Sequence, residues 1–147
     1  NRICHAMIPI MGFFGMDLYI DDLALFPLSE DLLALTRKNG IRNITTGKLD
    51  EYISELDVLV VTRGLQKGIF KEGQFPKEKE EEILKSFRPV DSELMEKMKS
   101  DAYLEMIPPR IFEIDTALDS DPRSIYSQKI YYAEVILSMM LHLLNEN

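Results

Sequence analysis

Short apolar runs and longer segments with helical spacing follow one another along the chain. Met16–Ile20, Val58–Val61 and Ala102–Ile107 are apolar runs of strand length, and Ile41–Thr45 is a weaker one. A segment with helical spacing or helix-capping residues lies between one run and the next. This order predicts an α/β domain in which a parallel sheet is covered by helices.

The predicted helices have recognisable ends. Ser29 is typical of an N-cap ahead of two acidic residues, and Gly40 is typical of the position just after a helix. Three helices are predicted in the first part of the chain: Arg2–Phe13 with a bend near Pro9, Ser29–Asn39, and Lys48–Glu55. A fourth is capped by Asp91 or Ser92 and runs to Lys99. The last helix has Pro122 near its first turn, and its apolar positions include Ile125, Ile130, Val135, Met139 and Leu143.

Composition narrows the class of protein. The 147 residues fit one domain, residues 1–147, and the net charge of −8 offers no basic face for nucleic acid. The charge-rich segment Lys71–Arg88 predicts an exposed loop leading into a solvated helix.

The single Cys4 excludes an internal disulfide framework and fits a reducing, cytoplasmic compartment. No apolar stretch approaches the ~20 residues of a membrane span. Because the chain opens without an initiator Met, we expect a part of a longer protein.

Polar and special residues follow two of the apolar runs. Arg63 and Gln66 come after Val58–Val61, and Pro108–Arg110 comes after Ala102–Ile107. If these strands are parallel neighbours, both loops leave the sheet at the edge where α/β proteins bind ligands. Arg63 is then a receptor for a carboxylate or a phosphate, although a solvated surface Arg fits this stretch equally well. Proline carbonyls can accept from an amine, so the pair suits a small amino acid better than a nucleotide.

Four motifs in order resemble the C-terminal, amino-acid-binding domain of the aspartate carbamoyltransferases. The family's R-T-V-H-S, D-V-L-Y…T-R-x-Q-K-E-R, H-P-L-P-R-x-x-E-I and D-x-x-P-x-x-x-Y-F-x-Q are similar to four segments of this chain. Those segments are Arg2–Ala6, Asp57–Lys67, Met106–Ile114 and Asp119–Gln128. The ornithine enzymes share the fold, but T-R-x-Q points to the aspartate branch. The resemblance implies a Rossmann-like three-layer domain with helices on both faces of the sheet.

The resemblance also implies residue roles. Arg2 would bind the α-carboxylate of L-aspartate, Arg63 its side-chain carboxylate, and Gln66 would bridge the substrate. The carbonyls of Pro108 and Pro109 would face the amino group and the carbamoyl amide. No catalytic residue, metal ligand or cofactor is implied for this chain. Carbamoyl phosphate would be held by an N-terminal domain that the chain lacks, so the chain alone is predicted to be inactive. A homotrimer and a role in pyrimidine biosynthesis are implied as well.

Several departures keep a second hypothesis open. An extra residue separates Arg63 from Gln66, Gly68–Ile69 replaces the family's E-R, and the start of the proline motif reads M-I-P-P. Apolar residues around Ile136 and Leu137 replace the Arg usual in the last helix. These changes favour a diverged, non-catalytic homologue that serves as a structural or assembly module. A packing or capping role suits His5 better than a catalytic one. A dinucleotide-binding module is disfavoured because no G-x-G-x-x-G follows a predicted strand.

Overall fold

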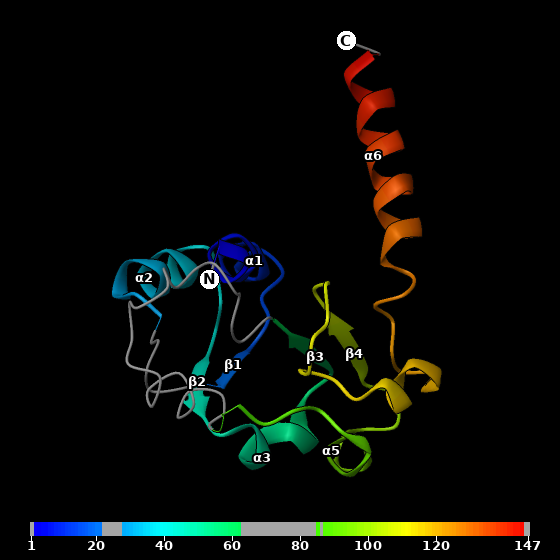
Figure 1. The fold of residues 1–147 in the computed structure, drawn as a ribbon. Helices are drawn as coiled ribbons and strands as arrows, with labels where there is room; N and C mark the ends of the chain where they lie inside the picture. The colour runs from blue at the N-terminus through cyan, green and yellow to red at the C-terminus, as the bar shows by residue number, and fades with distance from the viewer. Residues whose placement is uncertain (1, 22–27, 63–84, 86, 146–147) are drawn as a thin grey trace, which may run out of the picture. The chain divides into compact units, whose positions relative to one another are not determined.

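The computed structural model describes residues 2–21, 28–62, 85 and 87–145 (Figure 1). The chain divides into two compact units. Unit 1 comprises Asn1–Glu55 and Gly64–Arg88, and unit 2 comprises Leu56–Arg63 and Pro89–Asn147. Most of the predicted loop Lys71–Arg88 lies outside the described residues.

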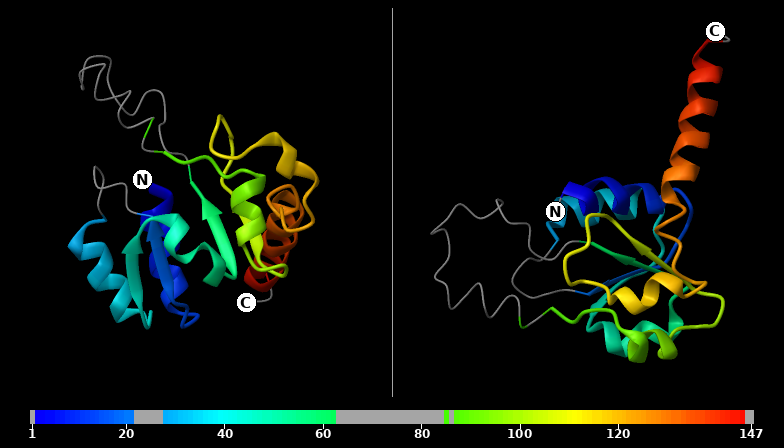
Figure 2. Two further views of the ribbon diagram at one scale, coloured as in Figure 1. Left: turned by 90° about the horizontal axis from the view of Figure 1, so that it is seen from below. Right: turned by 45° about the vertical axis from the view of Figure 1, so that its right-hand side comes forward.

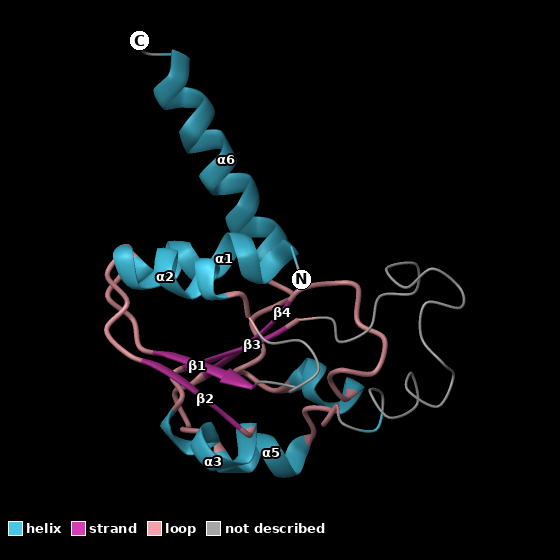
Figure 3. Ribbon diagram, turned by 90° about the vertical axis from the view of Figure 1, so that its left-hand side faces the viewer, coloured by secondary structure: helices cyan, strands magenta, loops and turns pink. Residues whose placement is uncertain are grey.

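Unit 1 is a small three-layer structure. Its strands β1 (Leu18–Asp21) and β2 (Ile44–Gly47) pair in parallel, with Leu18 opposite Ile44 and Asp21 opposite Gly47. Two helices lie on one side of this pair and a third on the other (Figure 3). The helices are α1 (Arg2–Gly12), α2 (Glu30–Lys38) and α3 (Leu49–Tyr52), the last continued by the 3-10 turn η1 (Ile53–Glu55).

Helices α1 and α2 pack at close range through a glycine. A Cβ on Gly12 would lie 2.8 Å from the Cβ of Asn39 and 3.0 Å from the carbonyl oxygen of Thr36. The Asn39 side chain donates a hydrogen bond to the carbonyl of Pro9 at 2.9 Å. Gly40 follows with φ of +106°, a left-handed conformation that glycine adopts readily. The chain can therefore leave α2 directly beside the end of α1.

Unit 2 is built on two parallel strands, β3 (Val58–Val61) and β4 (Tyr103–Met106). Backbone pairing extends beyond them, because the segment around Ser124 bridges to Leu104 and Val90 bridges to Ile114. Helix α5 (Ser92–Lys97) begins at the N-cap Asp91, whose carboxylate accepts from the Leu94 amide at 2.9 Å. The most deeply buried apolar side chains of the unit are Val90, Leu94, Met95, Ala102, Leu104, Ile114 and Leu118.

The last helix is α6 (Lys129–Asn145), coloured orange to red toward the C-terminus in Figures 1 and 2. Most of its described apolar side chains are exposed. Leu137 and Ile136 are each 57% exposed, and Leu144 is 72% exposed. Polar residues Glu134, Ser138 and His142 fall at intervals of four and form one stripe, so apolar residues occupy the rest of the circumference. Across the described residues, none of the helices has the length and apolar character needed to cross a membrane.

Among the described residues, the predicted strands and helices are present, most of them with shifted ends, and the predicted start of the last helix is wrong. Strands β1 and β2 begin two and three residues later than expected, at Leu18 and Ile44. Pro122 does not start the last helix. The backbone after it pairs with β4 instead, because Leu104 N donates to the Arg123 carbonyl at 2.8 Å and Ile125 N donates to the Leu104 carbonyl at 3.0 Å. This tertiary pairing keeps the segment extended and delays α6 to Lys129.

Candidate functional site at two adjacent strand ends

Strands β3 and β4 end side by side. Val61 lies opposite Met106 in the parallel register, and the Ile107 amide donates to the Val61 carbonyl at 3.1 Å. Thr62 and Ile107 therefore leave the sheet at the same edge. The expectation that the two strands are parallel neighbours is confirmed. Chain segments far apart in sequence meet where ligands bind in parallel α/β sheets.

The predicted binding residues are distributed unevenly over the described structure. Pro108 and Pro109 are exposed at the shared edge, directly after β4. Arg63 and Gln66 lie outside the described residues, beyond Thr62. Arg2 is the first residue of α1, in unit 1, and its side chain is not described. The structure thus brings the proline loop to the sheet edge where Thr62 lies. That all five residues form one binding site remains a prediction.

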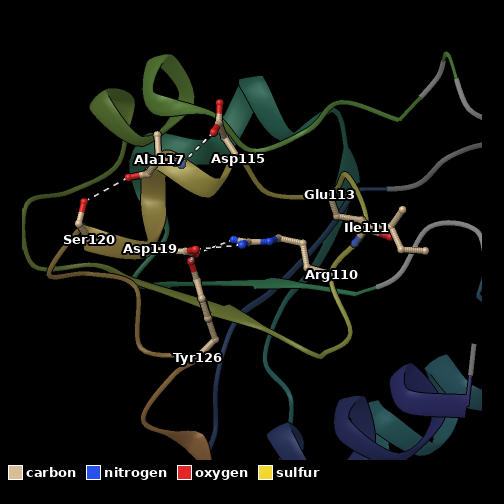
Figure 4. Close-up of polar contacts among 8 residues, drawn as sticks. All are labelled: Arg110, Ile111, Glu113, Asp115, Ala117, Asp119, Ser120 and Tyr126. Atoms are coloured by element: carbon tan, nitrogen blue, oxygen red, sulfur yellow. Dashed lines mark hydrogen bonds and ion pairs between the residues drawn. The ribbon is translucent and has the colours of Figure 1, made fainter.

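Arg110, next to the two prolines, forms a forked ion pair. Its Nη1 and Nη2 atoms contact the two carboxylate oxygens of Asp119 at 2.5 and 2.9 Å. The Tyr126 hydroxyl also donates a hydrogen bond to the Oδ1 atom of Asp119 (Figure 4). Planar two-point pairing of this kind fixes the direction of both side chains. The residue after the prolines is therefore held by Asp119, which is itself held by Tyr126 from a second segment of unit 2.

Glu113 holds the same loop from the inside. Its side chain is 2% exposed, and its Oε2 atom accepts from the backbone amides of Ile111 and Phe112 at 2.8 and 3.1 Å. Its Oε1 atom is buried and has no hydrogen-bond partner among the described residues. Burying a carboxyl group costs stability unless its oxygens are hydrogen-bonded. The two amide hydrogen bonds offset part of this cost, and they fix the backbone at Ile111 and Phe112.

The network is charged at neutral pH. Hydrogen bonds from Arg110 and then Tyr126 lower the pKa of Asp119 to about 2. Burial raises the pKa of Tyr126 first, and its hydrogen bond to Asp119 raises it further. Arg110 keeps its proton because the hydrogen bond to Asp119 raises its pKa as well. The guanidinium of Arg110 is thereby committed to Asp119 and is a poor candidate for a ligand anion.

Sequence reasoning assigned no role to Arg110, Glu113, Asp119 or Tyr126. All four lie inside the two later motifs that carry the resemblance, M-I-P-P-R-I-F-E-I and D-S-D-P-R-S-I-Y-S-Q. The residue types offered one signal, since an Arg and an Asp in adjacent motifs suggest pairing. The motifs alone did not show that these two residues contact each other.

The corresponding strand edge of unit 1 has a different character. Asp21 ends β1 opposite Gly47, the last residue of β2. Burial chiefly, and then the charges of Asp21 and Glu51, raise the pKa of the Tyr52 hydroxyl. An edge with these carboxylates repels a carboxylate ligand. In the part of the chain that the structure describes, no three potential metal-ligand side chains gather closely enough to hold a metal ion.

The chain is similar in sequence to aspartate carbamoyltransferase catalytic subunits. No family model matches it. It is 32% identical over 133 residues to the aspartate carbamoyltransferase catalytic subunit of Archaeoglobus fulgidus, covering 90% of this chain and 41% of that one. Over 93 residues it is 39% identical to the enzyme of Sulfurisphaera tokodaii, covering 63% of this chain and 29% of that one. The chain thus spans less than half the length of the curated relatives it matches.

Solved structures share its architecture. The catalytic subunit of M. jannaschii aspartate transcarbamoylase aligns over 100% of this chain and 46% of its own, with a TM-score of 0.79 and 24% identity. An ornithine carbamoyltransferase from Campylobacter jejuni aligns over 98% of this chain and 48% of its own, with a TM-score of 0.77 and 16% identity. At these identities the structures establish the fold alone.

The chain therefore has the Rossmann-like α/β fold of the carbamoyltransferases. Within that class its homologues are the catalytic subunits of the aspartate carbamoyltransferases, and the resemblance found in the four motifs is confirmed. The similarity covers a part of those subunits.

Proposed function

We propose that the chain is the aspartate-binding part of a carbamoyltransferase that forms N-carbamoyl-L-aspartate from carbamoyl phosphate and L-aspartate. The observation that carries the proposal is the register of β3 and β4, which puts Thr62 and the Pro108–Pro109 loop at one sheet edge. The sequence similarity to aspartate carbamoyltransferase catalytic subunits supports the substrate. One related structure, from Trypanosoma cruzi, holds aspartate and phosphate.

The proposed roles follow the chemistry of a dicarboxylic amino acid. Arg2 binds the α-carboxylate and Arg63 the side-chain carboxylate, because a guanidinium fork matches a carboxylate in shape and charge. Gln66 offers an amide donor and acceptor to the bound substrate. The carbonyls of Pro108 and Pro109 accept hydrogen bonds from the amino group and the carbamoyl amide. These contacts orient the amine for attack.

In the proposed reaction, the aspartate nitrogen attacks the carbamoyl carbon. A C–N bond forms, the C–O bond to phosphate breaks, and phosphate departs with the bonding electrons while the amine loses a proton. Positioning of the two reactants and cationic stabilisation of the departing phosphate supply the rate enhancement. This chain supplies the positioning of aspartate. The groups that bind phosphate belong to a carbamoyl-phosphate-binding part that the chain does not include.

We further propose that α6 packs against that carbamoyl-phosphate-binding part. Apolar side chains cover most of the helix circumference and are 40–72% exposed in the described structure. A helix that is apolar on most faces is normally buried by more than one neighbour. The curated relatives are more than twice as long as the matched region, so their fold contains additional structure able to cover such a helix. We propose a homotrimer and a cytoplasmic location on the resemblance alone.

A carbamoyl-aspartate assay on the intact natural polypeptide, with its mass measured alongside, tests the proposal. We expect a polypeptide of about twice this length that turns over both substrates. Absence of carbamoyl-aspartate from a folded, full-length protein would refute the enzymatic proposal.

The altered motifs support a second candidate, a non-catalytic homologue with a structural or assembly role. Met106 and Ile107 stand where the family pattern has H-P, and Gly68–Ile69 where it has E-R. On this proposal, the intact protein is folded and binds partner chains, and it shows no aspartate-dependent turnover. The same assay separates the two candidates.

A further inference from the structure

We propose that Arg110, Asp119 and Tyr126 are positioning residues that fix the backbone of the Pro108–Pro109 loop for ligand binding. The inference rests on the proposed function, because it assumes that this loop faces the substrate. None of the three side chains needs to touch the substrate. They act through the two prolines, whose carbonyls are the proposed acceptors.

The first step is the attachment of Arg110 to a fixed platform. Asp119 lies in the 3-10 turn η2 (Thr116–Ser120), which is closed at its start by the Ala117 amide donating to the Asp115 carboxylate at 2.9 Å. The Ser120 hydroxyl donates to the Ala117 carbonyl at 3.3 Å (Figure 4). Leu118, within the same turn, has a buried side chain. The carboxylate that holds Arg110 therefore has little freedom to move.

The second step is the return of the network to β4. Tyr126 holds Asp119, and its neighbour Ile125 donates its amide to the Leu104 carbonyl at 3.0 Å. Leu104 lies within β4, the strand that ends immediately before the proline loop. The path from β4 through the loop, Arg110, Asp119 and Tyr126 back to β4 is closed. A closed path of this kind restrains the loop more strongly than a single contact would.

The third step is the anchor on the other side of the loop. The Glu113 carboxylate accepts the amides of Ile111 and Phe112, and the Val90 amide donates to the Glu113 carbonyl at 2.9 Å. The residues between Met106 and Ile114 are thus tied down on both sides of Arg110. Preorganised acceptors bind a ligand more tightly because the ordering cost is met during folding.

The geometry also separates positioning from direct binding. Both terminal nitrogens of Arg110 already contact the carboxylate of Asp119. A ligand carboxylate would have to displace Asp119 in order to bind Arg110. A second forked pair in unit 2 offers a matched control. Arg123 contacts Asp121 at 2.8 and 3.0 Å and donates to the Met95 carbonyl at 2.8 Å, and none of these contacts involves the proline loop.

The experiment compares Asp119→Asn with Asp121→Asn in the intact protein, with Tyr126→Phe as a milder second variant. Hydrogen–deuterium exchange at Ile111 and Phe112 reports on the loop, and steady-state kinetics report on aspartate. For Asp119→Asn we expect faster exchange at both amides and a KM for aspartate raised on the order of 10-fold, with kcat within about 2-fold. Tyr126→Phe shifts both quantities in the same direction by less, and Asp121→Asn leaves both at the wild-type value.

Unchanged exchange in folded Asp119→Asn and Tyr126→Phe proteins would overturn the inference, as would an equal effect of Asp121→Asn. A wild-type protein without turnover would refute the proposed function instead, and the exchange comparison would still decide whether the network holds the loop. Circular dichroism confirms that each variant is folded before either measurement is interpreted.

Discussion

Val61 and Met106 lie opposite each other at the last paired position of β3 and β4. This relationship puts Thr62 and Ile107, the residues that follow the two strands, at one sheet edge, and it gives the candidate site its location. The pairing depends on Leu104, whose side chain is fully buried and whose backbone joins β4 to the segment around Ser124. Stability of this strand and geometry of the site are therefore linked.

Leu104→Ala should destabilise the protein by ~2–5 kcal/mol, the usual cost of truncating a fully buried leucine. The adjacent Tyr103, which is 49% exposed, provides the control. Tyr103→Ala should cost much less because its side chain is only partly removed from water. Urea denaturation of the intact protein measures both. Similar costs for the two variants would contradict the assigned core position of Leu104.

Gly12→Ala should destabilise unit 1 by ~1–3 kcal/mol through overpacking. The new methyl group would meet the Cβ of Asn39 at 2.8 Å. Helix propensity predicts the opposite sign, since Ala is favoured over Gly by ~1 kcal/mol within a helix. Thermal unfolding therefore decides between the contact and the propensity. A raised melting temperature would show that α1 and α2 do not pack as closely as described.

Asp119→Asn should change how stability depends on acidity. The folded pKa of Asp119, about 2, lies below its ordinary value of 3.8. The ionised carboxylate therefore contributes stability above about pH 4, and this contribution is lost as the pH falls toward 2. The variant should be less stable than wild type at pH 7, and the difference should shrink between pH 4 and pH 2. Urea midpoints at pH 7, 4, 3 and 2 check this, and a constant difference would argue against the pair.

Arg2→Ala in the intact protein should raise the KM for aspartate by ~10–100-fold, since charge-assisted hydrogen bonds contribute ~1.5–3 kcal/mol. Arg37, an exposed residue near the end of α2, supplies the control. Arg37→Ala should leave the KM unchanged because it removes the same charge away from the proposed site. If both variants behave like wild type, Arg2 has no part in aspartate binding.

Leu137→Glu should lower the melting temperature of the intact protein by at least ~5 °C if α6 is covered by the carbamoyl-phosphate-binding part. Ser138→Glu places the same charge on the polar stripe of α6, beside Glu134, and should have little effect. Differential scanning calorimetry compares the two. Equal melting temperatures would leave Leu137 in water and remove the basis for the proposed packing of α6.

The sequence by itself determined the elements and their order. Apolar runs specified Val58–Val61 as a strand without error, because a short buried strand needs only local apolar side chains. Ser29 was predicted as a cap, and the second cap was predicted to be Asp91 or Ser92; in the structure Ser29 and Asp91 each accept from an amide three residues ahead. The motifs specified the family, since their order and spacing are features of sequence.

Only the tertiary structure decided what joins those motifs. Pro122 carries a local signal for a helix start, yet pairing of the following backbone with Leu104 keeps that segment extended. Arg110 and Asp119 belong to different motifs, and although their opposite charges allow a pair, the sequence near either residue does not single out the other as its partner. Contacts between segments distant in sequence depend on how strands align and helices pack. The interaction energies of such contacts cannot be read from any short stretch of residues. The contacts among Arg110, Asp119 and Tyr126 were therefore found only in the tertiary structure.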